Sequence, residues 1–187
     1  GLDALLLTTE ADVRYFTGFL TRFWESPTRP WFLIVPASRD PIAVIPTIGA
    51  ALMAQTWTRD IRTWRSPDYD DDGVGLLVEA LKGFPAVGVP DGPETHVRMP
   101  LSNFKRLERQ LGGALRGDSG IMRALRMVKS TAEIAKITTA CQVANRAFAR
   151  VPEIARQGVP LGQVFRRFQM LCLEEGADWV PYLAGGA

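Results

Sequence analysis

The spacing of apolar residues changes once along this chain, and this change limits the folds open to it. In residues 1–120, short apolar runs rich in β-forming residues alternate with segments in which apolar residues recur every three or four positions. The runs are 2–8, 31–37, 41–47, 61–64 and 86–90, and the helical segments are 11–16, 48–57, 73–82 and 101–111. This alternation is typical of an α/β fold. The turn Arg39–Pro41 between two strand-like runs predicts a hairpin, so we expect a mixed sheet.

After the glycine-rich stretch 112–120 the pattern becomes purely helical, and we place a domain boundary at residue 120. Ser130 and Glu133 have the spacing of a capping box, which predicts a helix start. A second helix is predicted over 161–175, followed by a strand-like tail at 179–187. Two such helices bury one stripe each and need further elements to cover them. We therefore interpret 121–187 as the opening elements of a larger domain.

The first of these helices carries one apolar stripe, which we expect to face a core. The stripe consists of Ile134, Ile137, Cys141, Ala144, Phe148 and Val151. Pro152 is expected to kink this helix, and Gly158 with Pro160 to stop it. Cys141 and Cys172 both occupy apolar positions, which favours two buried thiols over a disulfide.

Composition and charge exclude several classes of function. The formal net charge is +2, and no basic stripe with interleaved aromatic residues is present, so we expect no nucleic-acid partner. No apolar run reaches the roughly 18 residues of a membrane span, and the first residues lack the pattern of a signal peptide. We therefore expect a cytoplasmic protein with no membrane partner.

Residues 68–79, "DYDDDGVGLLVE", match the calcium-loop template D-x-D-x-D-G-x5-E. Pro67 stands where the entering helix of such a site should run, and the preceding segment is strand-like. The alternative is that Asp71 or Asp72 caps a helix that begins at Gly73. His96, the only histidine, lies in a turn-rich segment and is expected to be an ordinary surface residue.

The segment Thr17–Trp31 combines aromatic residues with arginine on a loop that contains prolines. Its aromatic members are Phe19, Phe23, Trp24 and Trp31. Such a composition suits a partner surface or the wall of a ligand pocket. The alternative is that these side chains only cover one end of the sheet.

Two motifs carry a resemblance to a known family. "ADVRYFTGF" (11–19) and "LRMVKSTAEIAKITTACQVANRAF" (125–148) resemble the creatinase/prolidase/aminopeptidase P family of metallohydrolases. The resemblance implies a ribonuclease-H-like, mixed-sheet N-terminal domain over 1–120. It also implies that 121–187 supplies the first two helices and the first strand of an α+β "pita-bread" domain. Asp12 departs from the asparagine that is usual in this motif.

The resemblance also implies an activity for the complete protein. Active relatives are expected to hold two divalent metal ions (Mn, Co or Zn) through two Asp, one His and two Glu of the pita-bread domain. None of those positions falls within this chain, so we expect no catalytic or metal-binding residue and no activity in residues 1–187 alone. An Xaa-Pro dipeptidase or aminopeptidase is the leading interpretation. A creatinase-like C–N hydrolase, a lyase acting on a small metabolite and a non-catalytic binding module remain alternatives.

In such relatives the N-terminal domain assists dimer formation and reaches over the neighbouring subunit's active site. A homodimer that acts on a peptide or small-molecule substrate is therefore implied. Carried onto this chain, the resemblance implies that the loop after Gly18 is the part that reaches over the neighbouring subunit's active site. We predict Phe19, Arg22 and Trp24 as substrate-binding residues, with Arg22 able to pair with a carboxylate.

Overall fold

The computed structural model describes residues 1–26 and 29–183. Contacts between Cα atoms divide the chain into two compact units, Gly1–Arg126 and Met127–Ala187, and each is described by itself. This division falls six residues after the predicted boundary at residue 120. The helix α5 (Ile121–Met127) accounts for the difference, since nearly all of it belongs to the first unit.

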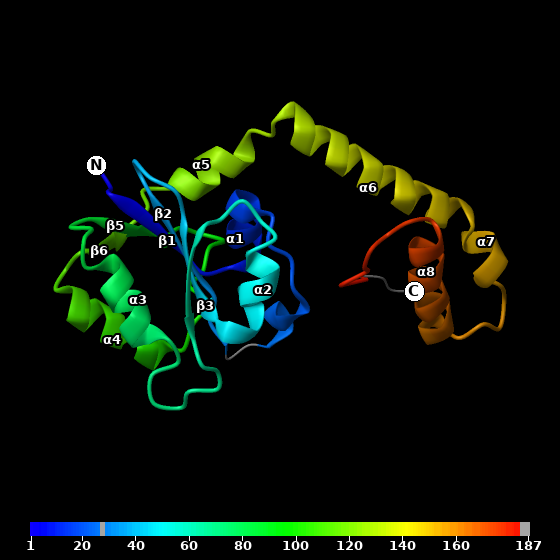
Figure 1. The fold of residues 1–187 in the computed structure, drawn as a ribbon. Helices are drawn as coiled ribbons and strands as arrows, with labels where there is room; N and C mark the ends of the chain where they lie inside the picture. Colours follow the sequence, from blue (N-terminus) through cyan, green and yellow to red (C-terminus); the bar gives the residue numbers. More distant parts are fainter. Residues whose placement is uncertain (27–28, 184–187) are drawn as a thin grey trace. The chain divides into compact units, whose positions relative to one another are not determined.

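The first unit is built on a six-stranded sheet in the order β4-β3-β2-β1-β5-β6 (Figure 1). Its strands are β1 (Ala4–Leu7), β2 (Phe32–Pro36), β3 (Ile42–Pro46), β4 (Asp60–Trp64), β5 (Val87–Val89) and β6 (Leu115–Gly117). β2 is antiparallel to both β1 and β3, and the other neighbours are parallel. The predicted α/β class, the hairpin at Arg39–Pro41 and the mixed sheet are therefore confirmed.

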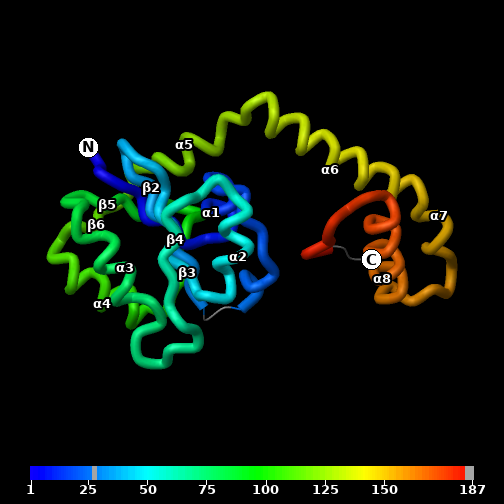
Figure 2. The backbone as a smooth tube through the Cα atoms, in the orientation of Figure 1, coloured from blue at the N-terminus to red at the C-terminus, as the bar shows by residue number. Residues whose placement is uncertain are grey.

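Alternate residues of the central strands point to opposite faces of the sheet, as the pleat requires. Leu6 and Phe32 belong to one buried cluster, with residues of α3 (Val74–Leu81) and α4 (Leu101–Leu111). Leu7 and Leu33 belong to a second cluster, with residues of α1 (Glu10–Thr17), α2 (Ala50–Met53) and α5. The backbone trace shows the same arrangement, with α3 and α4 on one side of the strands and α1 and α2 on the other (Figure 2). The strands are apolar on both faces because helices cover both faces.

Two segments of the first unit differ from the sequence prediction. The helix expected over 48–57 is a 3-10 turn, η2 (Thr47–Gly49), followed by a single turn of α2. It stops at Met53 because the hydroxyl and the backbone N–H of Thr56 both donate to the Met53 carbonyl oxygen, at 2.8 and 2.9 Å. The stretch 112–120, interpreted as a linker, contains β6, which pairs with β5 at the edge of the sheet.

Within residues 127–183 the second unit contains three complete helices, of which α6 (Thr131–Ala149) is the longest. Ser130 and Glu133 form the predicted capping box: the Ser130 Oγ accepts the Glu133 N–H at 3.3 Å, and the Glu133 carboxylate accepts the Ser130 N–H at 2.8 Å. Pro152 lies in the first turn of α7 (Val151–Ile154), which follows the end of α6. α8 (Leu161–Glu174) then packs against the end of α6, with Phe148 and Phe168 at a centroid distance of 4.7 Å.

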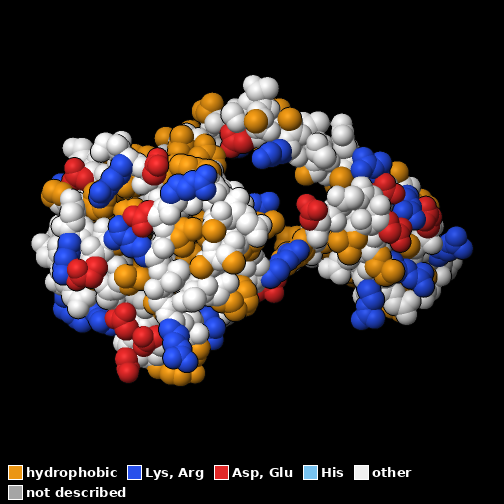
Figure 3. Space-filling view, in the orientation of Figure 1, with side chains coloured by type: hydrophobic (Ala, Val, Ile, Leu, Met, Phe, Trp, Pro, Cys, Tyr) orange, Lys and Arg blue, Asp and Glu red, His pale blue; other side chains and the backbone are white. Residues whose placement is uncertain are grey.

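The prediction that the apolar stripe of α6 faces a core is wrong for much of its length. Ile134, Ile137 and Phe148 are about half exposed or more, and Cys141 is exposed rather than buried. The buried cluster of this unit joins only the C-terminal part of α6 to α7 and α8, so within residues 127–183 the earlier turns have no covering element. Hydrophobic side chains also lie at the surface of the first unit over α5 (Figure 3), where Ile121 and Leu125 are each 42% exposed.

The tail after α8 was predicted to be a strand, but residues 179–183 form none. A strand needs a hydrogen-bonded neighbour, and residues 127–183 contain no other strand that could pair with it. Residues 184–187 of the predicted strand lie outside the described part of the chain.

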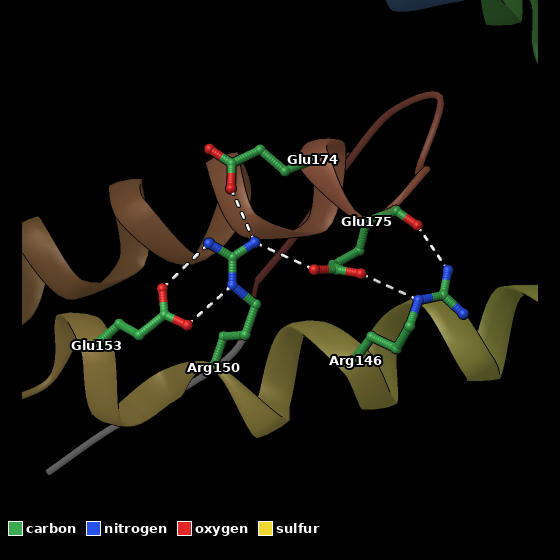
Figure 4. Close-up of polar contacts among 5 residues, drawn as sticks. All are labelled: Arg146, Arg150, Glu153, Glu174 and Glu175. Carbon is green, nitrogen blue, oxygen red and sulfur yellow. Dashed lines mark hydrogen bonds and ion pairs between the residues drawn. The ribbon is translucent and has the colours of Figure 1, made fainter.

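A group of five charged side chains fastens α8 to the end of α6 (Figure 4). Arg150 forms ion pairs with Glu153 at 3.0 Å, Glu174 at 2.9 Å and Glu175 at 3.1 Å. Arg146 donates to the Glu175 carboxylate at 3.0 Å and to the Glu175 backbone oxygen at 2.7 Å. Hydrogen bonds from Arg150 lower the pKa of the Glu153 and Glu175 carboxyl groups.

We expect this group to make the α6–α8 packing sensitive to acid. Because the pKa values of Glu153 and Glu175 are lower in the folded chain, their contribution is complete above the usual pKa of 4.5 and is lost as pH falls through the lowered values. Protection of α8 amides from hydrogen exchange, corrected for intrinsic rates, should therefore decrease between pH 5 and about pH 3. Arg150→Ala should remove most of this pH dependence, whereas Arg156→Ala, at an exposed arginine, should retain it. An unchanged pH dependence in Arg150→Ala would contradict the assignment.

Candidate functional surface

The loop that follows α1 is shaped by its own polar side chains. The Thr17 hydroxyl donates to the Val13 carbonyl oxygen at 2.7 Å and accepts the Phe19 N–H at 3.0 Å. Gly18, at φ 74°, ends the helix in the left-handed conformation that favours glycine. Four residues later the short helix η1 (Arg22–Glu25) begins, with the Thr21 hydroxyl accepting the Phe23 N–H at 3.2 Å. We refer to residues 19–26 and 29–31 as the aromatic loop.

Trp31 is the centre of the aromatic loop. Its ring lies 5.5 Å from Phe19, 5.7 Å from Trp24 and 6.3 Å from Phe23, measured between centroids. Trp31 and Phe19 are each 1% exposed and Trp24 is 7% exposed, so all three belong to the core on the α1–α2 side of the sheet. The loop is therefore packed onto the sheet by its own aromatic side chains.

The three predicted substrate-binding residues thus have different environments. Phe19 and Trp24 are buried, whereas Arg22 is exposed on η1. Phe23 is 44% exposed and is the aromatic member of the loop that presents a ring to solvent. The alternative interpretation therefore holds for Phe19, Trp24 and Trp31, which cover the sheet. Arg22 and Phe23 are exposed, and a binding role for this loop stays a prediction.

Exposed apolar side chains accompany the aromatic loop on neighbouring elements. We define the apolar surface as Tyr15, Leu20, Phe23, Ile48, Leu52 and Trp57, which are between 37% and 60% exposed. Contacts beneath them connect their elements: the Trp57 indole N–H donates to the Phe16 carbonyl oxygen at 2.8 Å, and Gly49 lies against the Trp31 ring. Exposed apolar side chains that gather on one surface are a feature of interaction sites, so we treat this group as a candidate.

Arg98 fixes the aromatic loop from a distant part of the chain, and sequence reasoning did not identify it. Its guanidinium group donates to the carbonyl oxygens of Arg29 at 2.7 Å, Trp24 at 3.0 Å and Ser26, and lies 5.2 Å from the Trp24 ring centroid. Its backbone N–H donates to the buried Thr8 hydroxyl at 2.8 Å. The segment around Arg98 is turn-rich and has no periodic pattern, so nothing in the local sequence indicated these contacts.

The aspartate that departs from the family motif also has a partner. The Asp12 carboxylate, 6% exposed as a residue, accepts the Thr9 hydroxyl and the Arg126 guanidinium, each at 2.8 Å. An asparagine would leave Arg126 without this negative charge. The pair joins α1 to α5, which explains why α5 belongs to the first unit.

The acidic segment 68–79 uses its carboxylates for internal contacts. Asp68 accepts the backbone N–H groups of Asp70 and Asp71, both at 3.1 Å. The Asp71 carboxylate accepts the Gly75 N–H at 2.9 Å and forms an ion pair with Arg106 at 2.6 Å. Asp71 therefore caps the first turn of α3, as predicted, although the helix begins at Val74 with Gly73 as the residue before it. Burial raises the pKa of the Asp72 carboxyl group.

Three further observations concern sites outside this surface. His96 is exposed, as predicted. Across residues 1–26 and 29–183, no group of three or more His, Cys, Asp or Glu side chains is placed to hold a metal ion. In the same ranges, none of the helices combines the length and apolar character needed to span a membrane.

The fold is that of an α/β domain with a mixed sheet covered by helices on both faces. The aromatic loop packs on the α1–α2 side of this sheet, and the apolar surface accompanies it. The model of the creatinase/prolidase N-terminal domain matches residues 1–128, and the chain belongs to this family. The predicted family resemblance is therefore confirmed.

Comparison with individual proteins agrees with this assignment. A Mycobacterium tuberculosis protein described as "Probable dipeptidase PepE" is 29% identical over 190 residues, which cover 100% of this chain and 48% of the relative. The crystal structure of dipeptidase PepE from Mycobacterium ulcerans superposes with a TM-score of 0.72 at 29% identity, over 97% of this chain and 47% of that one. The X-Pro aminopeptidase from Thermotoga maritima shares the fold, with a TM-score of 0.76 at 20% identity over 97% and 49% of the two chains. This chain spans about half the length of these relatives.

Proposed function

We propose that this chain is part of a metal-dependent Xaa-Pro dipeptidase or aminopeptidase-like enzyme, in which residues 1–126 serve dimer formation and access to the active site. The observation that carries the proposal is the family match over residues 1–128, together with an alignment to a described dipeptidase that covers the whole chain. The reaction itself is assigned to residues outside this chain.

The metal requirement is part of the proposal for the full-length protein. Such an enzyme would use two divalent ions, Mn, Co or Zn, to activate a water molecule and polarise the scissile carbonyl group. The donor groups of residues 1–26 and 29–183 do not fit a metal site, because no three of them converge. We therefore assign no catalytic step to this chain.

The proposed role of the first unit rests on the apolar surface and the aromatic loop. Half-exposed Phe23 and Trp57 side chains are of the type that a second subunit covers. The partner that we propose for this surface is a second copy of the protein, so that the functional form is a homodimer. Arg22, exposed on η1, is the residue that we propose to contact a peptide carboxylate near the active site.

Purified full-length protein, loaded with Mn²⁺ or Co²⁺, is expected to hydrolyse Xaa-Pro dipeptides in preference to Xaa-Ala dipeptides of the same length. The 187-residue chain should give no turnover above a blank that contains only metal, because the described residues hold no metal site. The measurement is release of proline, with creatine as the test of the C–N hydrolase alternative and light scattering to determine the oligomeric state. Turnover by the 187-residue chain, or an inactive full-length protein with both metals, would overturn the proposal.

A further inference from the structure

Arg98 contacts the aromatic loop through its side chain and the end of β1 through its backbone. Its guanidinium group contacts the carbonyl oxygens of Trp24, Ser26 and Arg29, which come from both described parts of the aromatic loop. Its backbone is held by Thr8, directly after β1. The aromatic loop is thereby connected to β1, one of the two central strands of the sheet, through one residue.

The geometry of these contacts requires a guanidinium group. Arginine presents several N–H donors in a rigid planar arrangement and stacks on aromatic faces, whereas lysine has a single compact charge on a flexible stem. Arg98 uses both properties, because it donates through Nη1 and Nη2 and also lies over the Trp24 ring at 5.2 Å. Burial lowers the pKa of the Arg98 guanidinium, and the negative charge of Glu10 acts in the opposite direction.

The position of the loop sets the position of its outward-facing residues. Arg22 and Phe23 belong to η1, whose last residues are followed directly by the Ser26 carbonyl group that Arg98 binds. The Trp24 carbonyl group, within η1 itself, is bound as well. Release of these carbonyl groups would remove the contacts that tie η1 to the segment around Arg98.

We infer that Arg98 is a positioning residue, which holds η1 in one conformation and thereby sets how substrate reaches the active site. This inference rests on the proposed function, since it assumes that the aromatic loop borders an active site. Arg98 itself has no contact with substrate in this scheme. It acts through Arg22 and Phe23, whose side chains are exposed.

The test compares full-length wild-type protein with Arg98→Ala, Arg98→Lys and the control Arg109→Ala, which replaces an exposed arginine of α4. Hydrogen exchange of residues 22–26 and 29–31 should be faster in Arg98→Ala, intermediate in Arg98→Lys and unchanged in Arg109→Ala. The KM for an Xaa-Pro dipeptide should rise about tenfold in Arg98→Ala while kcat changes little, because a displaced Arg22 would lose one charge-assisted hydrogen bond to the substrate. A purely structural role would instead lower kcat through a smaller active fraction and leave KM unchanged.

Two results with Arg98→Ala would overturn the inference. One is unchanged hydrogen exchange of residues 22–26 and 29–31, and the other is faster exchange with an unchanged KM. Full restoration of both values by Arg98→Lys would show that charge alone suffices and would overturn the argument from guanidinium geometry. If the wild-type protein hydrolyses no dipeptide, the proposed function fails, and the exchange comparison still decides whether Arg98 holds the loop.

Discussion

Replacing Trp31 with alanine is expected to lower the free energy of unfolding of the first unit by about 3 to 5 kcal/mol. Trp31 is 1% exposed and contacts the rings of Phe19, Phe23 and Trp24, so its removal leaves a cavity beneath the aromatic loop. Its indole nitrogen has no hydrogen-bond partner among the described residues, so the loss would come from packing. Guanidinium chloride unfolding, followed by circular dichroism, measures the effect.

Trp57→Ala provides the control for this substitution. Trp57 is 51% exposed and donates one hydrogen bond, to the Phe16 carbonyl oxygen, so its replacement should cost only about 1 kcal/mol. Equal losses in the two variants would show that the aromatic loop is not packed around Trp31. The comparison therefore tests the arrangement on which the proposed role of the loop depends.

Gly73→Ala is expected to destabilise the first unit by about 2 to 5 kcal/mol, through backbone strain and steric overlap together. Gly73 has φ 82°, and a Cβ atom placed on it would lie 2.5 Å from Cδ2 of the buried Trp64 ring. Neither the backbone nor the ring can move without disturbing the cluster beneath α3. The midpoint of chemical unfolding measures the loss.

Gly83→Ala is the matched control, because a Cβ atom at Gly83 meets nothing within 4 Å. Its stability should change by less than about 1 kcal/mol. If contact with Trp64 causes the loss, Gly73→Ala combined with Trp64→Leu should cost less than the sum of the single changes. Strict additivity would show that backbone strain alone is responsible.

Gly73 also shows that residues of the calcium-loop pattern have structural roles in this chain. The template requires glycine at this position for a sharp turn around an ion. Here the same glycine makes the turn into α3 and allows the backbone to approach Trp64, while Asp68 and Asp71 accept backbone N–H groups. The sequence alone does not distinguish a glycine that turns around an ion from one that turns into a helix beside a tryptophan.

Periodicity was sufficient to predict most of the sheet, because five of its six strands are apolar runs bounded by turns. β6 (Leu115–Gly117) was missed because its residues, LRG, form no apolar run, and it pairs only with β5 at the edge of the sheet. α4 was predicted with both ends correct, because its apolar spacing is regular and Gly112 ends it. Local patterns thus identify the elements whose own residues carry a regular apolar spacing.

The site was less predictable than the fold. Composition indicated the aromatic loop, but it did not distinguish the buried rings of Phe19 and Trp24 from exposed Phe23. Arg98 could not be found at all, because its partners lie 69 to 90 residues away in sequence. Contacts between residues so far apart in sequence are set by the tertiary fold, and no local pattern of residues predicts them.

The place of β1 in the sheet has a consequence for how the domain is assembled during synthesis. β1 lies between β2 and β5, so the strand on which both sides of the sheet are built is made before the other five. β2 ends at Pro36 and can pair with β1 at once, and β3 then pairs with β2, whereas β5 begins only at Val87. Until then β1 keeps one edge of unpaired backbone groups, which is the kind of edge that other chains can join. The nascent domain is therefore most exposed to misassembly before residues 87–89 have been made.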